Sequence, residues 1–126
     1  LAPVFDCGSC LFPQLNEEAI HETLLNRGKI NDHVFNRPTS AITKNGKRIN
    51  YFEFISSCEN KDCNEALKRI VPRIDMNKIN KLIDETTPIA DEHKLFLKTI
   101  LSARKELIID FSYNKLRKTE RLAADF

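Results

Sequence analysis

Residues 91–111, DEHKLFLKTILSARKELIIDF, carry the strongest pattern in this sequence. Apolar residues recur three or four positions apart, the spacing that places side chains on one face of an α-helix. An acidic residue at 91 or 92 suits a first helical turn, and we expect the helix to continue to about residue 118. Its wide apolar stripe predicts a central packing element. The stripe consists of Phe96, Ile100, Ala103, Leu107 and Phe111, with Leu95, Leu97, Leu101 and Ile108 beside it.

Four shorter helices are predicted upstream, each from a polar cap or a residue that ends a helix. An Asn or Asp before the first turn accepts a backbone N–H, and Gly or Pro commonly ends the pattern. Residues 29–38 show no clear period and are expected to form a loop. The predicted helices are 15–27 between Asn16 and Gly28, 51–57 after Asn50, 60–71 before Pro72, and 76–85 after Asp75.

The strongest β signal lies between these helices, at residues 40–49. Asn45-Gly46 suits a two-residue hairpin turn, whose central residues need positive φ angles. The arms are short, so a small surface hairpin is expected. In the next helix, Tyr51, Phe52 and Phe54 are predicted to enter the core.

The predicted fold class is mainly α: a helical subdomain of about four to five helices, a hairpin near 41–49, and a short N-terminal strand at Val4-Phe5. We expect residues 1–126 to form a single domain. The net charge is 20 − 18 = +2, with no long single-sign block, which argues against direct nucleic-acid binding. No apolar run approaches the roughly 18 residues of a membrane span, and no leader segment is recognisable, so a cytoplasmic protein is expected.

The first candidate site is Asp6-Cys7-Gly8, directly after the predicted strand. A carboxylate at this place can bind Mg²⁺, because hard cations prefer oxygen ligands and ATP phosphates supply most of the others. Gly8 would let the backbone turn sharply beside the metal. Taken alone, the triplet also fits an ordinary turn after a strand.

The second candidate site is a zinc site made by the four cysteines. Their spacings, two residues between the first pair and four between the second, fall within the range of four-thiolate sites. Against this, Cys7 lies inside the Asp-x-Gly triplet and Cys63 inside a predicted helix. Four unrelated thiols are favoured, and the question stays open at this point. The cysteines are Cys7, Cys10, Cys58 and Cys63.

Residues 1–11, LAPVFDCGSCL, resemble the metal-binding segment of HipA-like serine/threonine kinases. Residues 37–42 (RPTSAI), residues 45–52 (NGKRINYF) and the long last helix also look like the helical C-terminal part of small members of that family. The resemblance implies that Asp6 is the metal ligand and Gly8 the turn glycine. It departs at Cys7, where the family is expected to carry Asn.

The same resemblance implies parts that are not found in residues 1–126: a catalytic loop, a phosphate-covering loop and an ATP-anchoring Lys. No catalytic residue is therefore assigned in this chain. Mg²⁺ and ATP are expected in the intact kinase only, and the chain alone is expected to lack kinase activity. Implied partners are the missing N-terminal kinase portion or a second copy, and an antitoxin-like protein, since such kinases often belong to toxin–antitoxin pairs in bacteria.

A different class of function also fits the sequence. A helical adaptor without catalytic activity would dock a protein partner through an exposed apolar face. The residues expected on that face are Val4, Phe5, Leu11 and Phe12.

Overall fold

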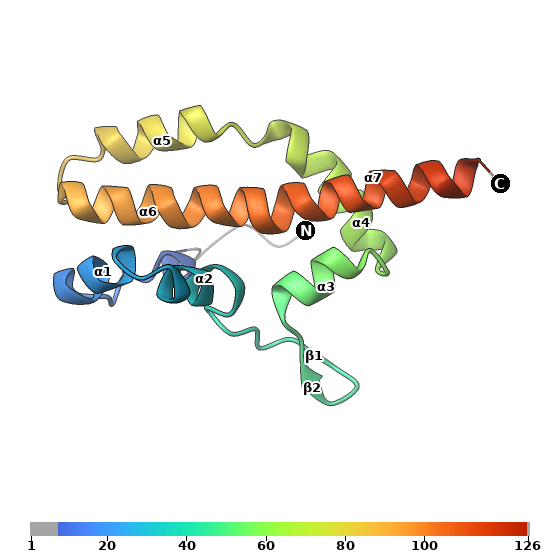
Figure 1. Ribbon diagram of the computed structural model, residues 1–126, viewed down its shortest axis with the longest axis horizontal. Coiled ribbons are helices and arrows are strands. Elements are labelled where there is room, and N and C mark those ends of the chain that lie inside the picture. The colour runs from blue at the N-terminus through green and yellow to red at the C-terminus, as the bar shows by residue number, and fades with distance from the viewer. Residues whose placement is uncertain (1–7, 126) are drawn as a thin grey trace.

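One long continuous helix forms the axis of the protein. In the computed structural model, which describes residues 8–125, this axis consists of α6 (Asp91–Arg104), the π-helical segment η3 (Lys105–Asp110) and α7 (Phe111–Ala124). It runs the length of the molecule, and the other helices pack along it (Figure 1). The central helix predicted from residues 91–118 is confirmed, and it extends about a turn and a half further than expected.

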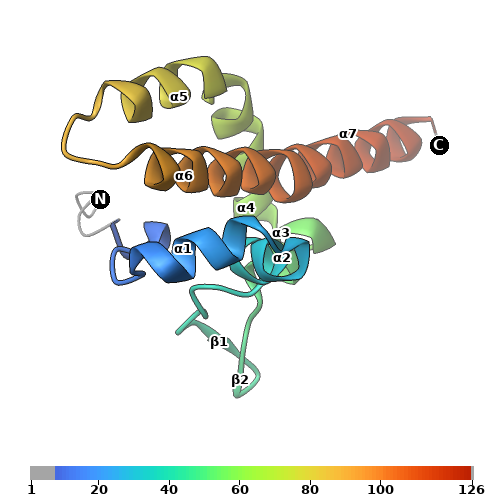
Figure 2. The ribbon, with the colours of Figure 1, turned by 60° about the vertical axis from the view of Figure 1, so that its left-hand side comes forward.

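The shorter helices divide between the two ends of this axis. Three of them contact α6: α1 (Glu17–Leu24), α2 (Arg27–Phe35) and α5 (Met76–Glu85). The other two, α3 (Tyr51–Ser57) and α4 (Lys61–Ile70), contact α7. Helix α5 lies on the side of the axis opposite α1 and α2, as two views show (Figures 1 and 2). The mainly helical fold class is confirmed.

Within the main apolar cluster, the best-buried side chains come from α6 and from the two helices packed beneath it. Phe96 and Ile100 are 0% and 1% exposed, and Ile20 of α1 and Val34 of α2 pack against them in one apolar cluster. Each such side chain removed from water contributes roughly 1.5–3 kcal/mol. The first half of the predicted stripe is therefore the centre of the core.

The second half of the predicted stripe is wrong, because η3 changes the helical register. Leu107 and Phe111 are 39% and 49% exposed, whereas Ile108 is 7% exposed. A π-helical turn bonds residue i to i+5 and so inserts an extra residue into the helix. Every position after η3 is displaced by one, and the residues buried along α7 are Ser112 and Leu116.

The predicted loop at 29–38 is also wrong, since most of it forms α2. Asn26 ends the preceding turn and caps α2, with its side-chain oxygen accepting the Lys29 N–H at 3.1 Å. Gly28 lies in the first turn of α2 and does not end α1. Asn26, the second-to-last residue of the predicted 15–27 helix, therefore begins a second helix, and α1 stops at Leu24.

The remaining helices begin within one residue of their predicted starts. Asn50, Asn60 and Asp75 cap α3, α4 and α5, and a short 3-10 turn, η2 (Val71–Arg73), contains Pro72 after α4. Of the three aromatic residues expected in the core, Tyr51 is 42% exposed, while Phe52 and Phe54 are half-buried. The prediction is therefore wrong for Tyr51, which faces a surface hollow.

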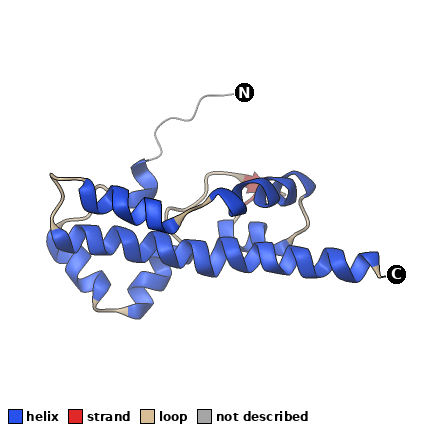
Figure 3. Cartoon of the chain, turned by 90° about the horizontal axis from the view of Figure 1, so that it is seen from above, coloured by secondary structure: helices blue, strands red, loops and turns tan. Residues whose placement is uncertain are grey.

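The predicted hairpin is confirmed. Strands β1 (Thr43–Lys44) and β2 (Lys47–Arg48) pair antiparallel around Asn45 and Gly46, whose φ angles are +53° and +77°. Both strands are exposed on both faces, and the hairpin projects away from the helices (Figures 1 and 2). Seen from above, with helices in blue, the chain is almost entirely helical (Figure 3). The strand predicted at Val4-Phe5 lies outside the described residues. No helix among residues 8–125 combines the length and apolar character needed to cross a bilayer.

Candidate functional site

The described part of the chain begins at Gly8, two residues after the predicted metal ligand Asp6. Asp6 and Cys7 lie outside the described residues, so the metal-binding role of Asp6 stays a prediction. Gly8 opens a short 3-10 helix, η1 (Gly8–Leu11). A Cβ added to Gly8 would contact no described atom within 4 Å. Packing within the described structure therefore gives no reason for glycine there, and its role beside a metal also stays a prediction.

Phe12 fixes η1 to the helical core. Its φ angle is +56°, a conformation that bulky residues seldom adopt. The ring lies edge-on to His33 at 4.7 Å between centroids and to Phe96 at 6.2 Å. Leu11 and Phe12 both pack against the core cluster, so they do not form the exposed apolar face that a docking adaptor would need. Val4 and Phe5 lie outside the described residues.

Arg104, the last residue of α6, joins three parts of the chain at this place. Its guanidinium donates hydrogen bonds to the backbone carbonyls of Cys10 at 2.8 Å, His33 at 3.1 Å and Arg37 at 2.9 Å. It also lies over the Phe12 ring, 5.3 Å from the centroid. Burial lowers the pKa of the Arg104 guanidinium, although an arginine in such a place remains charged.

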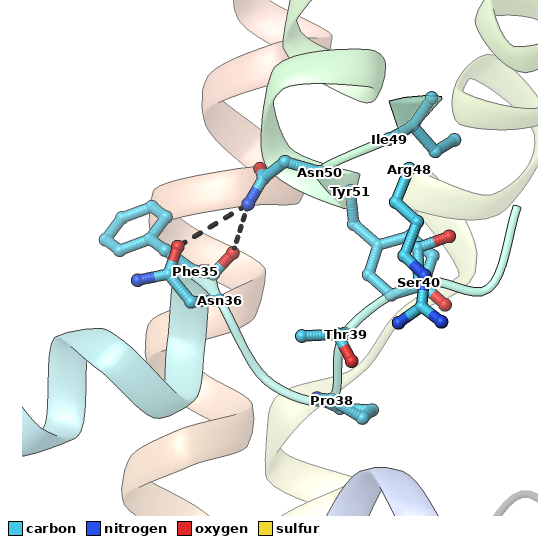
Figure 4. A pocket seen from close by; sticks show the side chains of 9 residues that line it. All are labelled: Phe35, Asn36, Pro38, Thr39, Ser40, Arg48, Ile49, Asn50 and Tyr51. Carbon is cyan, nitrogen blue, oxygen red and sulfur yellow. Dashed lines mark hydrogen bonds between the residues drawn. The ribbon is translucent and has the colours of Figure 1, made fainter. Parts of the chain in front are cut away.

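Residues 37–40 separate two surface hollows. The first, of about 280 Å³, lies between this segment and the start of α3 and is lined by Thr39, Arg48 and Tyr51 among others (Figure 4). On its wall, the Asn50 amide donates to the Phe35 carbonyl at 3.0 Å. Ser40 is buried, and its hydroxyl accepts the Ile42 N–H at 3.0 Å. The Arg37–Pro38 peptide is cis.

The second hollow, of about 420 Å³, lies between residues 37–39 and the η1 segment. Its polar lining residues include Ser9, Gln14, His33 and Arg37. Among the described residues, no Asp or Glu lines either hollow. The positively charged residues on their walls are Arg48 in the first hollow and Arg37 in the second, and Arg37 is paired with Asp32 at 2.7 Å.

The described cysteines do not form one cluster. Burial, together with the nearby Cys58, raises the pKa of the Cys63 thiol. The Cys58 thiol contacts the Ser112 carbonyl on α7 at 3.7 Å, whereas the Cys10 carbonyl is held by Arg104, eight residues earlier on the long helix. Within residues 8–125, no three His, Cys, Asp or Glu side chains are grouped as metal ligands would be. Cys7 lies outside this range.

Two residues that sequence reasoning passed over occupy this site. The ring of His33 packs against Phe12 and lines the second hollow. Arg104 carried no motif. Its only signal was a charged residue directly beside the apolar stripe at Ala103, a position where burial of the side chain requires hydrogen-bond partners.

Comparison with known proteins identifies the relatives of this chain. No family model matches it. It is 46% identical over 116 residues to the serine/threonine-protein kinase CtkA of Helicobacter pylori strain J99, an alignment that covers 91% of this chain and 36% of the relative. The chain is homologous to part of CtkA, a HipA-like serine/threonine kinase.

The structural comparison agrees with the sequence. The crystal structure of CtkA, described as a proinflammatory kinase of Helicobacter pylori, matches with a TM-score of 0.87 and 44% identity over 93% of this chain. The match covers 42% of the CtkA chain in that structure, so this chain spans less than half of the kinase it resembles. The resemblance to HipA-like kinases is thus confirmed, and the chain corresponds to a helical part of such a kinase rather than to an unrelated adaptor.

Proposed function

We propose that residues 1–126 form one domain, the C-terminal helical part of a cytoplasmic, bacterial HipA-like serine/threonine kinase. The observation that supports this most is the 46% identity to CtkA across 91% of the chain. In the proposed kinase, Asp6 would be the carboxylate that holds Mg²⁺ beside ATP, and the metal would supply positive charge that offsets the charge of the phosphates. The described residues hold η1, which follows Asp6 in the sequence, and line the hollows beside residues 37–40.

The helical part alone is proposed to be inactive. Phosphoryl transfer depends on positioning ATP and the substrate hydroxyl, and on stabilising charge with several groups at once. We propose that the catalytic loop, the phosphate-covering loop and the ATP-anchoring Lys belong to an N-terminal kinase portion, the main partner of these helices. An antitoxin-like protein is proposed as a second partner of the whole kinase, and no direct contact with nucleic acid or membrane.

The first test is a transfer assay on the purified chain. With labelled ATP and a generic protein substrate, we expect no transfer above background, because one carboxylate cannot orient Mg-ATP by itself. Transfer that disappears on Asp6→Ala would show that the chain is catalytically sufficient, and would contradict the proposed division of roles.

The second test places the chain in a complete kinase. A chimera would carry this chain in place of the matching 116-residue region of CtkA. We expect the chimera to phosphorylate protein substrate and Asp6→Ala to reduce its activity to background. The matched control is Asp125→Ala, at an exposed carboxylate near the end of α7, which should leave activity unchanged. Full activity of the Asp6→Ala chimera would overturn the metal-binding role.

A further inference from the structure

A further cavity, which we call the η3 cavity, lies where η1, α2, α3 and η3 meet. Its volume is about 350 Å³, and most of its wall is apolar. Ligand-binding cavities in proteins have this character, with apolar walls and a few polar groups that orient the ligand. The apolar residues that line the η3 cavity are Val34, Phe35, Pro38, Ile55, Ile108 and Ile109.

The apolar part of this wall is suited to an aromatic group. Ile108 and Ile109 follow each other in η3, and Ile55 belongs to α3, which packs against η3. The side chains of Phe35 and Tyr51 also line the cavity. Such walls offer water few hydrogen bonds, so an apolar ligand group can replace the water there at little cost. An aromatic group gains further from contact with aromatic side chains.

The charged residues on the wall are both cationic. Among the described residues, Arg37 and Arg104 line the η3 cavity, and no Asp or Glu does. The charge of Arg37 is offset by the Asp32 carboxylate at 2.7 Å. Arg104 has no such partner, because its hydrogen-bond acceptors within residues 8–125 are three backbone carbonyls. The wall therefore carries one arginine charge that no described carboxylate offsets.

An arginine charge of this kind favours an anionic ligand. Burial lowers the pKa of the Arg104 guanidinium, because its surroundings solvate the charge less well than water does. A carboxylate beside it would offset that cost through charge-assisted hydrogen bonds. The guanidinium has five N–H groups, of which the carbonyls engage three. The other two are left for the neighbouring Cys10 side chain and for a ligand.

We propose that the η3 cavity binds a small aromatic carboxylate, with the ring against Ile108 and Ile109 and the carboxylate on Arg104. The charge of Arg104 distinguishes this class of ligand from neutral or cationic molecules of the same shape. Binding is non-covalent. The inference goes beyond the proposed kinase part and does not depend on the role of Asp6.

The first experiment is methyl NMR on the full chain with labelled isoleucine. The probe is phenylacetate, and phenylacetamide and phenethylamine present the same ring with a neutral and a cationic group. We expect saturable shifts at the methyl groups of Ile55, Ile108 and Ile109, and none at Ile89, which lines a separate hollow. The Kd of phenylacetamide should be about 10-fold higher than that of phenylacetate, because the charge assistance is lost. Phenethylamine should bind more weakly than either.

Two variants locate the bound probe. Ile109→Phe adds volume inside the cavity and should abolish the saturable shifts at Ile55 and Ile108. The matched control is Leu122→Phe, at a 55% exposed position on the same long helix, which should leave the Kd of phenylacetate unchanged. Arg104→Met should bind phenylacetate and phenylacetamide equally. Should Arg104→Met fail to fold, the three probes and Ile109→Phe still test the proposal.

A preference for the carboxylate that disappears with the binding in Ile109→Phe would support the proposal. Equal Kd values for the three probes would overturn it, since Arg104 would then select no anion. Shifts that persist unchanged in Ile109→Phe would also overturn it, because the probe would lie elsewhere. The CtkA chimera gives a last check. Phenylacetate that binds the chain but not the chimera would mean that the N-terminal kinase portion fills the cavity, and would overturn the proposed ligand site.

Discussion

Helices α1, α2, α3 and α4 each begin at an asparagine whose side-chain oxygen accepts a backbone N–H three residues later. Asn50 does more than cap. Its oxygen accepts the Glu53 N–H at 3.0 Å, while its amide nitrogen donates to the Phe35 carbonyl at the end of α2, also at 3.0 Å. One side chain thus satisfies the start of one helix and the end of another.

This double role gives a prediction at the residue scale. Asn60→Ala removes only a cap bond, to the Cys63 N–H, and should lower the free energy of unfolding by about 1 kcal/mol. Asn50→Ala removes a comparable cap and also leaves the Phe35 carbonyl without this donor, so about 2 kcal/mol is expected. Urea denaturation of both variants measures the difference. Equal losses would show that the bond to Phe35 contributes nothing.

Sequence reasoning at this scale succeeded where a residue acts on its near neighbours. The caps Asn16, Asn50 and Asp75 are predicted from the sequence because a cap bonds within three residues of itself. Asn26 was missed because Gly28 two residues later also suggested a helix end. Arg104 was beyond reach, since its hydrogen-bond partners lie 67 to 94 residues away in the chain.

At the scale of elements, the π-helical segment η3 governs which side chains the long helix buries. Within η3, Lys105 forms an ion pair with Asp110 at 2.7 Å, five residues apart. In an α-helix, side chains three or four apart are the neighbours, so a contact at five suits the wider π turn. The sequence-based prediction of the apolar stripe used one helical period throughout, and it is therefore wrong for Leu107 and Phe111.

Alanine substitutions at two adjacent positions test this register. Ile108→Ala should cost about 2–5 kcal/mol because a buried side chain is removed from the core cluster. Leu107→Ala should cost less than about 1 kcal/mol, since Leu107 is 39% exposed. Thermal or urea unfolding gives both values. An uninterrupted α-helix would bury Leu107 with Phe96 and Ile100, and would reverse this order.

At the scale of the whole molecule, stability is unevenly distributed. The core cluster joins α1, α2, α5 and the axial helix, whereas every residue of β1 and β2 is exposed. A two-stranded hairpin is marginally stable by itself in water. We infer that the hairpin can open without unfolding the helices, because little apolar surface would be exposed by opening it.

Two substitutions separate local from global stability. Gly46→Ala places a side chain at φ +77° and should open the hairpin, seen as faster hydrogen exchange at residues 43–48. The unfolding free energy of the helices should change by less than about 1 kcal/mol. Phe96→Ala, in the core, should lower it by about 3–5 kcal/mol. A large global loss in Gly46→Ala would show that hairpin and helices unfold together.

The family was accessible from the sequence, while the arrangement of the site was not. Residues 1–11 carry the resemblance to HipA-like kinases because a metal-binding motif is short, local and limited in its chemistry. The hollows beside residues 37–40 combine η1, α2 and the start of α3, and no local pattern reports how those segments meet. The hydrogen bonds of Arg104 help to hold η1 beside residues 37–40 in the described structure. The place of Arg104 itself depends on packing over the whole chain.

Because Arg104 donates to backbone carbonyls, its hydrogen bonds limit which substitutions this protein can tolerate. Every residue type carries a carbonyl, so exchanges such as Cys10→Ser, His33→Gln or Arg37→Lys leave the acceptors in place. Position 104 has no such freedom, because only arginine supplies the fork of donors. Substitutions at positions 10, 33 and 37 are therefore expected to keep these hydrogen bonds, whereas a substitution of Arg104 is expected to remove them.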